Sequence, residues 1–487
     1  MAHLLMYALG SLRGRRTIVH LLAPADEKTR ECMETTYGLV KIFRASSGYY
    51  VYDGATGRIL TVAPQLIHES ETTTEAAVLR YLLARRMVSG SPLPDILWEY
   101  DFPRYLEMLE DQIPALLLQI TRRCNLNCDY CVYSGNYAHM EPHANQDMTE
   151  DILCRSIDFF AAHSGGRSQV TVDFYGGEAL LCFRRVQEAI QYAKQLMPNR
   201  AILFRATSNG VLLDEHIAQF LKEHPEMRVL VTVNGPYHDR HRRDWAGNGS
   251  LGRIMDNLRR LREDFPDVWE HQIHFIANVA HGNHMPAVVD FYRREIGKPP
   301  DVITRIRGTD ANEIVDRLLS EETGTEIEDG LRRSYCESGD PFLEPCFGQP
   351  VRAARERRIA ADGAPGVIGS CMPPLQKLFV LADGSFGVCE TCCDKVRIGD
   401  LEHGFDKEKL RRIYDGARRL FQSQCRTCWA QRLCTVCLKD VFESNGSLAE
   451  RVSGGFCRDS RRYVLEQLRM YCEIADTHPE RIGAQHS

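Results

Sequence analysis

The sequence has no apolar run of about eighteen residues, the length that a membrane-spanning helix needs. A strong charge imbalance is absent as well, because 60 basic residues face 66 acidic ones and leave a formal net charge of −6. This balance gives no broad electrostatic reason to expect nucleic acid or a membrane as a partner. Low-complexity tracts and internal repeats are also missing. The composition, 44% hydrophobic and 26% charged over 487 residues, is that of a folded chain of several domains.

The start of the chain lacks a clear secretory signal. Residues 1–12 are largely apolar, but the basic residues Arg13, Arg15 and Arg16 follow this run instead of preceding it, and no small-residue cleavage site is evident. We therefore expect a cytoplasmic protein. Disulfides are rare in a reducing cytoplasm, so the 18 cysteines indicate metal binding or redox chemistry.

The cysteines are unevenly distributed along the chain. Cys32 is the only one in the first 120 residues, three lie between Cys124 and Cys131, and nine lie between Cys371 and Cys457. This distribution divides the chain into parts with different chemistry.

Residues 1–112 are predicted to form a small α+β, winged-helix-like module. Short runs of β-branched and aromatic residues alternate with turn residues there, and Pro92, Pro94 and Pro103 mark a linker that follows. The expected elements are strands at Leu39–Phe43, Gly48–Asp53 and Arg58–Ala63 and a helix at about Thr74–Met87.

Residues 113–325 change to a repeated rhythm of strand and helix. Continuous apolar strands that alternate with helices favour a parallel sheet with right-handed crossovers. Six such units predict a partial (β/α)6 barrel of the TIM type, since a complete eight-unit barrel usually needs about 250 residues. The expected strands are Leu116–Ile120, Val170–Phe174, Ile202–Ala206, Val229–Val233, Ile273–Val279 and Val302–Ile306. The expected helices begin near Asp151, Arg184, Asp214, Leu251, Pro286 and Asn312.

The first cysteine group follows the first barrel strand directly. Cys124, Cys128 and Cys131 have the spacing CxxxCxxC. Three thiolates on one short loop can bind a single iron–sulfur cube and leave the fourth iron without a protein ligand. Loops at the carboxyl ends of barrel strands build active sites, and this loop is the first of them. The alternative is a set of buried or zinc-binding thiols.

This loop resembles the signature of the radical S-adenosylmethionine (AdoMet) enzymes, in which an aromatic residue precedes the last cysteine. Tyr130 matches that aromatic residue. The resemblance implies a [4Fe–4S] cluster on Cys124, Cys128 and Cys131, with AdoMet chelated to the open iron. It further implies reductive cleavage of AdoMet to a 5′-deoxyadenosyl radical.

Residues at the other strand ends resemble further motifs of that family. The resemblance assigns them to cofactor binding: Glu178 would hold the ammonium group of AdoMet, and Arg242 would lie near its carboxylate. Relatives carry an aspartate where this chain has Asn234, which puts a carboxylate role there in doubt. The residues concerned are Gly176, Gly177 and Glu178 after the second strand, Ser208 and Asn209 after the third, Asn234 after the fourth, and Arg242.

The C-terminal part, residues 326–487, is predicted to be loop-rich and rich in cysteine. It resembles the SPASM extension of radical AdoMet enzymes, with twelve residues between Cys371 and Gly384 and four between Gly384 and Cys389. It departs from that pattern in having two residues, not three, before Cys437. The resemblance implies one auxiliary [4Fe–4S] cluster on Cys425, Cys428, Cys434 and Cys457, and another on Cys371, Cys389 and Cys437.

The fourth ligand of the cluster on Cys371, Cys389 and Cys437 stays open. Cys346, Cys336, Cys392 or Cys393 would complete it, or the iron would be free to bind a substrate thiol. Zinc is the alternative metal for all seven cysteines, although an odd number of ligands fits Cys₄ zinc sites poorly.

Segments around the cysteines resemble maturases of cysteine-rich peptides, of the ranthipeptide or sactipeptide type. Examples are Gly387–Glu390, Cys428–Cys434 and Cys131–Tyr137. The resemblance implies thioether formation in a ribosomally made, Cys-containing precursor peptide. It also implies an electron donor such as a flavodoxin or a ferredoxin, and a leader peptide bound by strand addition to the N-terminal module.

Several alternatives remain open from the sequence. The N-terminal module could be a stabilising cap, and the same scaffold could form ether or carbon–carbon crosslinks. It could also oxidise a protein residue as sulfatase maturases do, or use its auxiliary clusters only to relay electrons to a small molecule. A zinc-stabilised binding protein is the alternative from another class.

Overall fold

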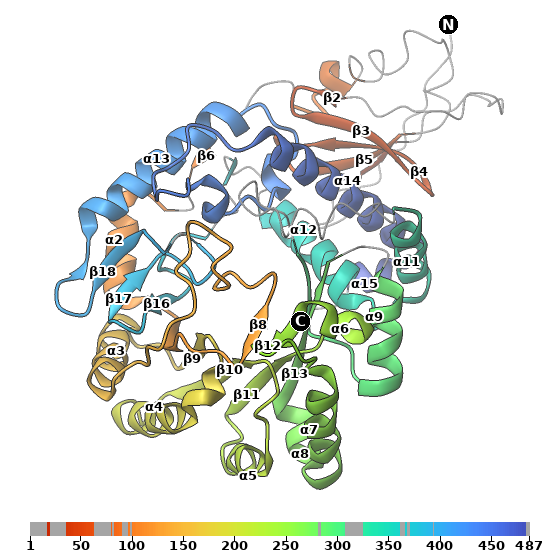
Figure 1. Cartoon of the computed structure of the whole chain (residues 1–487). Helices are drawn as coiled ribbons and strands as arrows, with labels where there is room; N and C mark the ends of the chain where they lie inside the picture. Colours follow the sequence, from red (N-terminus) through yellow and green to blue (C-terminus); the bar gives the residue numbers. More distant parts are fainter. Residues whose placement is uncertain are drawn as a thin grey trace, which may run out of the picture.

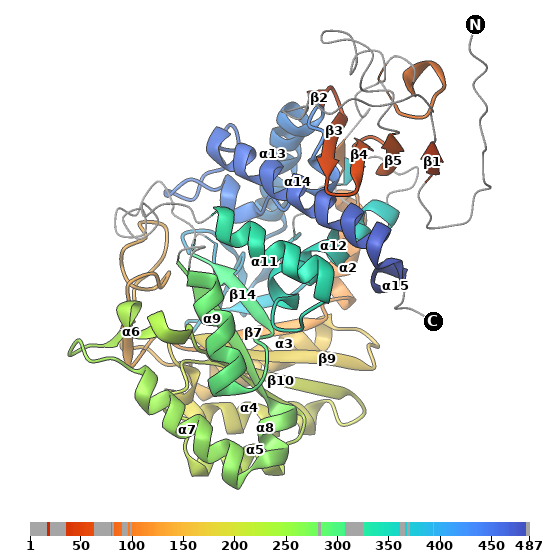
Figure 2. The same cartoon turned by 90° about the vertical axis from the view of Figure 1, so that its right-hand side faces the viewer.

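A computed structural model describes residues 17–19, 36–62, 79, 82–89, 96–97, 100–280, 284–306, 325–360, 366–367, 371–392 and 394–483. One ten-stranded sheet organises these residues, and helices surround it (Figure 1). A second, five-stranded sheet near the N-terminus packs at one side (Figure 2).

Six parallel strands form the major part of the large sheet. Their apolar side chains are buried: Val172, Phe174, Val229 and Val231 are at most 1% exposed. The strands, in their order across the sheet, are β7 (Ala115–Thr121), β9 (Gln169–Gly176), β10 (Ala201–Ser208), β11 (Met227–Thr232), β13 (Ile273–Val279) and β14 (Val302–Arg305). They lie within a residue or two of the six predicted strands, so the expected α/β arrangement with a mostly parallel sheet is confirmed.

Helices follow these strands close to the predicted starting points. Thr149 caps one of them by accepting a hydrogen bond from the N–H of Ile152, and Asp214 caps another through Ile217. These helices are α3 (Glu150–His163), α4 (Phe183–Leu196), α5 (Glu215–Glu223), α7 (Leu251–Asp264), α8 (Pro266–Gln272) and α9 (Met285–Phe291). The helix predicted to begin near Asn312 lies outside the described residues.

The C-terminal part of the chain extends the same sheet. Strand β16 (Leu378–Val380) pairs in parallel with β7, so it occupies the edge that the barrel strands would otherwise leave open. Antiparallel strands β17 (Ser385–Gly387), β18 (Arg397–Asp400) and β19 (Gly404–Phe405) continue from it. The cysteine-rich part is therefore joined to the barrel by backbone hydrogen bonds as well as by the chain.

The remaining elements lie mainly around this core. The helices are α2 (Phe102–Asp111), α6 (His238–His241), α11 (Thr325–Ser338), α12 (Gln349–Ala360), α13 (Lys407–Cys425), α14 (Gly454–Thr477) and α15 (Pro479–Gly483). The short strands are β6 (Ile96–Leu97) with β15 (Gly366–Val367), and β8 (Leu126–Cys128) with β12 (Arg242–Asp244). The 3-10 or π turns are η2 (Ala179–Cys182), η3 (Gly235–Tyr237), η5 (Tyr292–Ile296), η6 (Glu344–Gly348), η7 (Gln431–Leu433) and η8 (Leu438–Val441). No described helix is both long and apolar enough to cross a membrane.

The N-terminal sheet contains strands at the three predicted places. Its order is β1 (Thr17–Val19), β5 (Arg58–Val62), β4 (Gly48–Asp53), β3 (Val40–Ala45) and β2 (Thr36–Tyr37). Strands β2 to β5 are antiparallel neighbours, whereas β1 pairs in parallel with β5. Most of the helix predicted at Thr74–Met87 lies outside the described residues, and a winged-helix likeness stays a prediction.

The inner face of this sheet packs on the C-terminal part of the chain. Phe43, Tyr50 and Tyr52 are fully buried there and belong to the same hydrophobic core as the barrel. Helix α14 crosses the sheet beside β3 (Figure 2), and the Tyr50 hydroxyl donates a hydrogen bond to Asp476 on that helix. The sheet is thus held by the helix that carries Cys457, the last cysteine of the predicted auxiliary group.

The turn between β4 and β5 packs tightly against the segment that contains Trp429 and Arg432. The buried guanidinium of Arg432 donates from Nε to the carbonyls of Gly54, at 2.8 Å, and Ala55, at 3.1 Å. A Cβ atom on Gly54 would lie 2.3 Å from the carbonyl oxygen of Trp429, so only glycine allows this approach. The N-terminal sheet therefore touches the loop that carries Cys428 and Cys434.

We predict that Gly54→Ala weakens this packing. The added methyl group would force two backbone segments apart and lower the stability by about 1–3 kcal/mol. Gly252→Ala on α7 is a matched control, because no atom lies within 4 Å of its Cβ position and alanine favours helices. Thermal melting checks both variants; equal melting of Gly54→Ala and the wild type would contradict the described contact.

Candidate active site

The first cysteine group lies at the carboxyl end of the parallel sheet, where barrel enzymes place their active sites. Strand β8 carries Cys128 in this loop and pairs antiparallel with β12, so that Arg242 is the register partner of Cys128. Two segments that are more than 100 residues apart in sequence are thereby joined beside the thiols.

The Gly176–Gly177 turn packs directly on the backbone of the cysteine loop. Gly177 N–H donates to the carbonyl of Thr121, and Glu178 N–H donates to that of Arg123, both at 2.8 Å. A Cβ atom would lie 2.1 Å from the Thr121 oxygen at Gly176 and 1.9 Å from the Arg123 oxygen at Gly177. Gly176 also has a φ of +124°, which L side chains rarely adopt. The two glycines therefore allow the turn to approach the backbone of the cysteine loop closely.

The carboxylate of Glu178 joins this turn to the end of β10. It is 1% exposed and accepts hydrogen bonds from the Ser208 hydroxyl at 2.8 Å and the Asn209 N–H at 2.6 Å. Burial raises its pKa, while these donors and Arg242 oppose that effect. The Asn209 amide donates in turn to Asn125 in the cysteine loop at 2.7 Å. The predicted site residues Glu178, Ser208 and Asn209 thus lie together beside the cysteine loop, although they come from two strand ends.

The hydroxyl of Tyr130 accepts hydrogen bonds from side chains in three further parts of the chain. It accepts from Asn234 Nδ2 at 2.8 Å, from Arg242 Nη1 at 3.1 Å and from Asn278 Nδ2 at 3.5 Å. Burial opposes the charge of Arg242, but Tyr130 and Cys128 raise its pKa overall. The asparagine at 234 suits this position because its amide donates to Tyr130 while its oxygen accepts from the Asn278 N–H.

Of the three thiols of the loop, Cys128 is buried and Cys124 and Cys131 are partly buried, and they are close enough to affect one another electrostatically. Burial, Glu178 and the neighbouring thiols Cys128 and Cys131 raise the pKa of Cys124 to about 12. Burial likewise raises the pKa of Cys131 to about 11. Ionised thiolates in such surroundings need a positive charge beside them, and iron supplies one. The donor set therefore fits an iron–sulfur cluster.

The thiols of the C-terminal part affect one another electrostatically, and their ligand sets stay a prediction. Burial raises the pKa of Cys425 to about 12, and the thiols Cys428, Cys434 and Cys457 act in the same direction. Cys437 has Cys371 as its thiol neighbour. Within the part of the chain that the structure describes, no three His, Cys, Asp or Glu side chains surround the position of a single metal ion. In an iron–sulfur cube each thiolate binds a different iron.

Two tyrosines separate the first cysteine group from Cys389. Burial, Glu390 and both Cys131 and Cys389 raise the pKa of Tyr175, so its hydroxyl lies within electrostatic range of both thiols. The ring of Tyr133 packs against it edge to face at 6.4 Å, and the Tyr133 hydroxyl donates to the Glu390 carbonyl at 3.0 Å. These side chains border the space between two predicted cluster sites.

A partly buried ion pair lies at the same place. The Lys377 ammonium contacts the Glu390 carboxylate, whose other oxygen lies 3.0 Å from the sulfur of Cys389. Burial opposes both charges, but their attraction raises the pKa of Lys377 and lowers that of Glu390 overall.

The candidates for a fourth ligand beside Cys371, Cys389 and Cys437 lie in different places. The sulfur of Cys346 is 3.5 Å from that of Met285 on α9, and the Cys336 carbonyl accepts a hydrogen bond from Arg481 on α15. Cys392 is fully buried, and its N–H donates to the Cys389 carbonyl at 3.2 Å. Cys393 lies outside the described residues. Of the three candidates that the structure describes, Cys392 is the one that shares a turn with Cys389.

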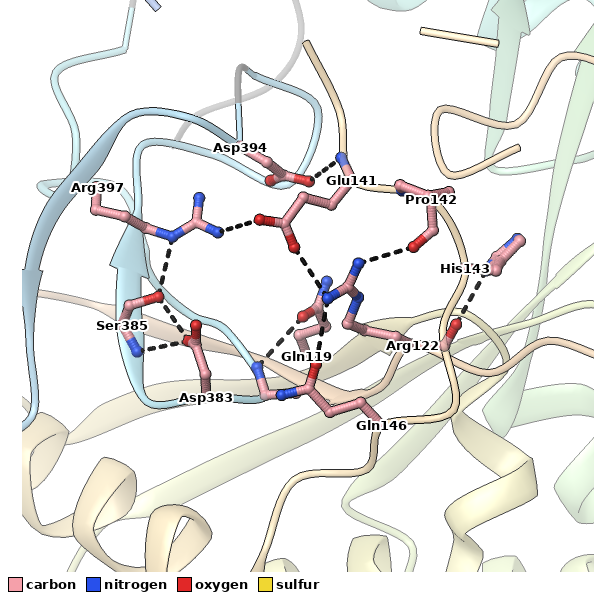
Figure 3. A network of polar contacts seen from close by, with 11 residues as sticks. Gln119, Arg122, Glu141, Pro142, His143, Gln146, Asp383, Ser385, Asp394 and Arg397 are labelled. Carbon is pink, nitrogen blue, oxygen red and sulfur yellow. Dashed lines mark hydrogen bonds and ion pairs between the residues drawn. The ribbon is translucent and has the colours of Figure 1, made fainter. Parts of the chain in front are cut away.

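A polar network ties the cysteine loop to the added strands (Figure 3). The carboxylate of Glu141 bridges Arg122, at 2.9 Å, and Arg397 on β18, at 3.3 Å. Asp394 accepts from the Glu141 N–H at 3.1 Å, and Arg122 also donates to the Pro142 carbonyl at 2.8 Å. The segment after Cys131 is therefore fixed to the C-terminal part of the chain.

Several residues of this site were missed in the sequence. Asn278 sits near the carboxyl end of β13, and the reasoning that selected the other strand ends would have found it. Glu390 directly follows Cys389 and could have been considered for that reason. Nothing in the local sequence around Lys377 or Tyr133 indicates their place, because both reach it through long-range packing.

Comparison with known proteins agrees with this geometry. Residues 118–279, which run from β7 to the end of β13, match the model of the Radical SAM superfamily. These residues, about a third of the chain, are similar to a radical AdoMet domain. Enzymes of this superfamily bind a [4Fe–4S] cluster and AdoMet and cleave AdoMet reductively, and Cys124, Cys128 and Cys131 are the residues that fit the cluster here. Cys154 and Cys182 also lie in the matched range, whereas the cysteines of residues 326–487 lie outside it.

Two relatives align over this domain. An uncharacterised protein of Methanocaldococcus jannaschii is 31% identical over 125 residues, which are 26% of this chain and 40% of the relative. A serine-type anaerobic sulfatase-maturating enzyme of Bacteroides thetaiotaomicron is 27% identical over 143 residues, 29% of this chain and 34% of that enzyme. The chain thus spans less than half the length of either relative.

A solved structure shares the fold over a longer range. Native anSMEcpe with bound AdoMet aligns with a TM-score of 0.53 and 18% sequence identity, covering 76% of this chain and 98% of its own. At this identity the likeness describes the fold, which is the radical AdoMet α/β fold with its large, mostly parallel sheet.

We predict that Tyr130→Phe destabilises the radical AdoMet domain. Loss of the hydroxyl leaves Arg242 and Asn234 without this buried acceptor, at a cost of about 1–3 kcal/mol. Thermal melting and AdoMet affinity of the iron-loaded protein check this, and both should decrease. Tyr192→Phe is the matched control, because its hydroxyl bonds only to Asp158 at the surface and its loss should change stability by less than about 0.5 kcal/mol. Equal melting of the two variants would contradict the role of Tyr130.

Proposed function

We propose that the protein is a radical AdoMet enzyme that crosslinks a ribosomally made precursor peptide. The crosslink is a thioether between a peptide cysteine and a backbone or side-chain carbon. One observation carries the proposal: Tyr175 packs in one apolar cluster with Cys131 and lies within electrostatic range of Cys389, so the radical-forming loop and an auxiliary thiol group are neighbours. A peptide carbon and a peptide sulfur must be brought to two such neighbouring centres for a carbon–sulfur bond to form.

In this proposal the chain's own residues hold and orient the reactants. Cys124, Cys128 and Cys131 carry the catalytic cluster, and Glu178, Ser208, Asn209, Asn234 and Arg242 form the AdoMet side of the site. Tyr133, Tyr175, Lys377 and Glu390 line the peptide side. The bound cluster and AdoMet supply the hydrogen-abstracting radical. Formation of one thioether removes two hydrogens from the peptide: one would pass as an atom to the 5′-deoxyadenosyl radical, and the other would leave as a proton while an auxiliary cluster takes up the remaining electron.

Residues 326–487 would form a SPASM domain that holds two auxiliary [4Fe–4S] clusters. Cys425, Cys428, Cys434 and Cys457 are the ligands of one, and their mutual proximity supports that set. Cys371, Cys389 and Cys437 are ligands of the other, which keeps one position for the substrate thiol or fills it with Cys392. The substrate would then be bound next to Tyr175.

Residues 1–112 would bind the leader part of the precursor peptide, with residues 113–325 as the catalytic barrel. Among the described residues, β1 and β2 are the edge strands of the N-terminal sheet, and an open edge accepts a peptide by strand addition. A protein substrate also agrees with the sulfatase-maturating relative, whose name denotes action on another protein. Oxidation of a protein residue is therefore the second candidate reaction.

The product of the reaction tests the proposal. The iron-loaded protein, AdoMet, a reductant and the Cys-containing peptide encoded nearest to its gene should give 5′-deoxyadenosine and a peptide lighter by two hydrogens per crosslink. The crosslinked cysteine should resist alkylation by iodoacetamide. A peptide that loses two hydrogens but keeps a reactive thiol would favour residue oxidation instead, and an unchanged peptide would overturn the proposal.

Iron content provides a separate test of the three clusters. The wild type should bind about twelve irons, and replacing Cys124, Cys128 and Cys131 by alanine should remove about four of them and abolish 5′-deoxyadenosine formation. Cys154→Ala on α3 is the matched control and should change neither quantity. A colourless protein that binds zinc in place of iron would contradict all three sites.

A further inference from the structure

A small hollow lies among the helices of the C-terminal part. Its lining comes from α11, α12, α14 and α15, which lie next to one another (Figure 2). Its floor is apolar, because Tyr335, Val351 and Ile474 line it and each is at most 4% exposed. The hollow has about 290 Å³ of empty space, near the lower limit for a ligand pocket, so it has room for one side chain or one small group. We call it the α12 hollow.

Three arginines line the α12 hollow, and no described acidic residue does. Arg352 and Arg355 come from α12, and Arg481 comes from α15. The carboxylate of Glu344 forms an ion pair with Arg352, and its other oxygen accepts a hydrogen bond from the Tyr335 hydroxyl at 2.6 Å. Glu344 therefore balances one of the three positive charges and leaves two.

The guanidinium of Arg481 is held in one orientation. It donates to the backbone carbonyls of Cys336, at 2.7 Å, and Tyr335, at 3.1 Å, and it lies 4.8 Å from the centre of the Tyr335 ring. Gly339, which has a φ of +67°, allows this position, since a Cβ atom there would lie 3.1 Å from Cζ of Arg481. Carbonyl oxygens accept hydrogen bonds but carry no full negative charge. The charge of Arg481 is thus fixed in place without being balanced.

Arg355 is partly buried and has no partner within the part of the chain that the structure describes. No ion pair and no hydrogen bond joins it to another described residue, so the N–H groups of its guanidinium remain available. Two cations that line one hollow repel each other, and an anion between them removes that repulsion. A carboxylate is an especially good partner, because it can accept two parallel hydrogen bonds from a guanidinium.

The α12 hollow lies between the N-terminal sheet and the barrel. Ile474, which lines it, is on helix α14, and Asp476 on the same helix accepts the hydrogen bond from Tyr50 of the N-terminal sheet. On the other side, Gln349 at the start of α12 donates to the carbonyl of Asp301 at 3.1 Å, next to the edge strand β14. The hollow is therefore located between the parts to which the proposed function assigns leader binding and catalysis.

We propose that the α12 hollow binds an acidic side chain of the precursor peptide, with Arg355 and Arg481 on its carboxylate and the apolar floor beneath its methylene groups. The inference rests on the proposed function, which supplies the peptide as substrate. A nucleic acid is a poor match, because it needs a row of cations along its phosphates and this hollow accepts one group. A free anion such as phosphate shares the chemistry of the carboxylate, and the experiment separates the two sources.

The experiment measures binding to the anaerobic iron-loaded full-length protein by fluorescence anisotropy. The first probe is the labelled Cys-containing peptide encoded nearest to the gene, and the second is the same peptide with every Asp and Glu replaced by Asn and Gln. The test variant is R355Q, which removes no contact within the described protein. The control variant is R253Q, which removes the same charge from an exposed arginine on α7. Titration calorimetry with sodium phosphate is the parallel measurement on all three proteins.

The acidic peptide should bind R355Q about tenfold more weakly than the wild type, and the KM for that peptide should rise by the same factor. R253Q should behave like the wild type, and all three proteins should have the same iron content and melting temperature. The amide peptide should bind the wild type about as weakly as the acidic peptide binds R355Q, with no further loss in that variant, since both changes remove the same contact.

Equal affinity of R355Q and R253Q for the acidic peptide, or equal affinity of the wild type for the two peptides, would overturn the α12 hollow as a carboxylate site. Phosphate binding that depends on Arg355 while peptide binding does not would assign the hollow to a free anion and overturn the peptide as its source. In each of these cases crosslinking by the wild type would continue. A wild type that neither binds nor modifies the peptide would instead overturn the proposed function, and this inference with it.

Discussion

The close contact between two strand ends sets the geometry of the catalytic loop. Strands β7 and β9 are parallel neighbours, and beyond their ends the Gly176–Gly177 turn continues to pair with Thr121 and Arg123. No side chain fits between these backbones, so the position of the turn and the position of the loop that follows β7 determine each other. Cys124 directly follows Arg123, where this pairing ends. Glu178 then ties the end of β10 to the same turn through its hydrogen bonds with Ser208 and Asn209.

A single phenol connects the other side of the loop to the barrel. The hydroxyl of Tyr130 collects donors from residues 234, 242 and 278, which arise from three separate parts of the chain. Because one of these donors is a buried guanidinium, the loop is bound to the strand ends by a charge-assisted contact as well as by neutral hydrogen bonds. The thiols thus lie between a backbone contact on one side and a polar contact on the other.

The barrel could be predicted because each of its strands is recognisable from its own short stretch of sequence. Each of the six runs is rich in apolar residues and bounded by polar or turn residues, and a parallel buried strand favours that pattern. The cysteines and strand-end residues could be selected for a similar reason, since their spacing is short. By contrast, β16 is three residues long and its partner β7 is more than 250 residues away, so no local pattern reveals their pairing. Lys377 and Glu390 lie on either side of the β16–β17 hairpin, 13 residues apart, but their place beside the barrel depends on the pairing of β16 with β7. The packing of the N-terminal sheet on α14 is equally non-local. The sequence therefore indicates the individual elements but not how elements that are far apart in the chain pack against one another.

The pairing of β16 with β7 has a consequence for how this architecture can be divided. An apolar strand at the edge of a sheet exposes unpaired backbone groups, which invites association with other chains. Here the missing neighbour of the barrel is supplied by the segment that precedes the last cysteines. A C-terminal part taken from another enzyme would therefore have to match the side chains of the interface and also supply a strand that pairs with β7. The barrel and the C-terminal part thus form one structural unit.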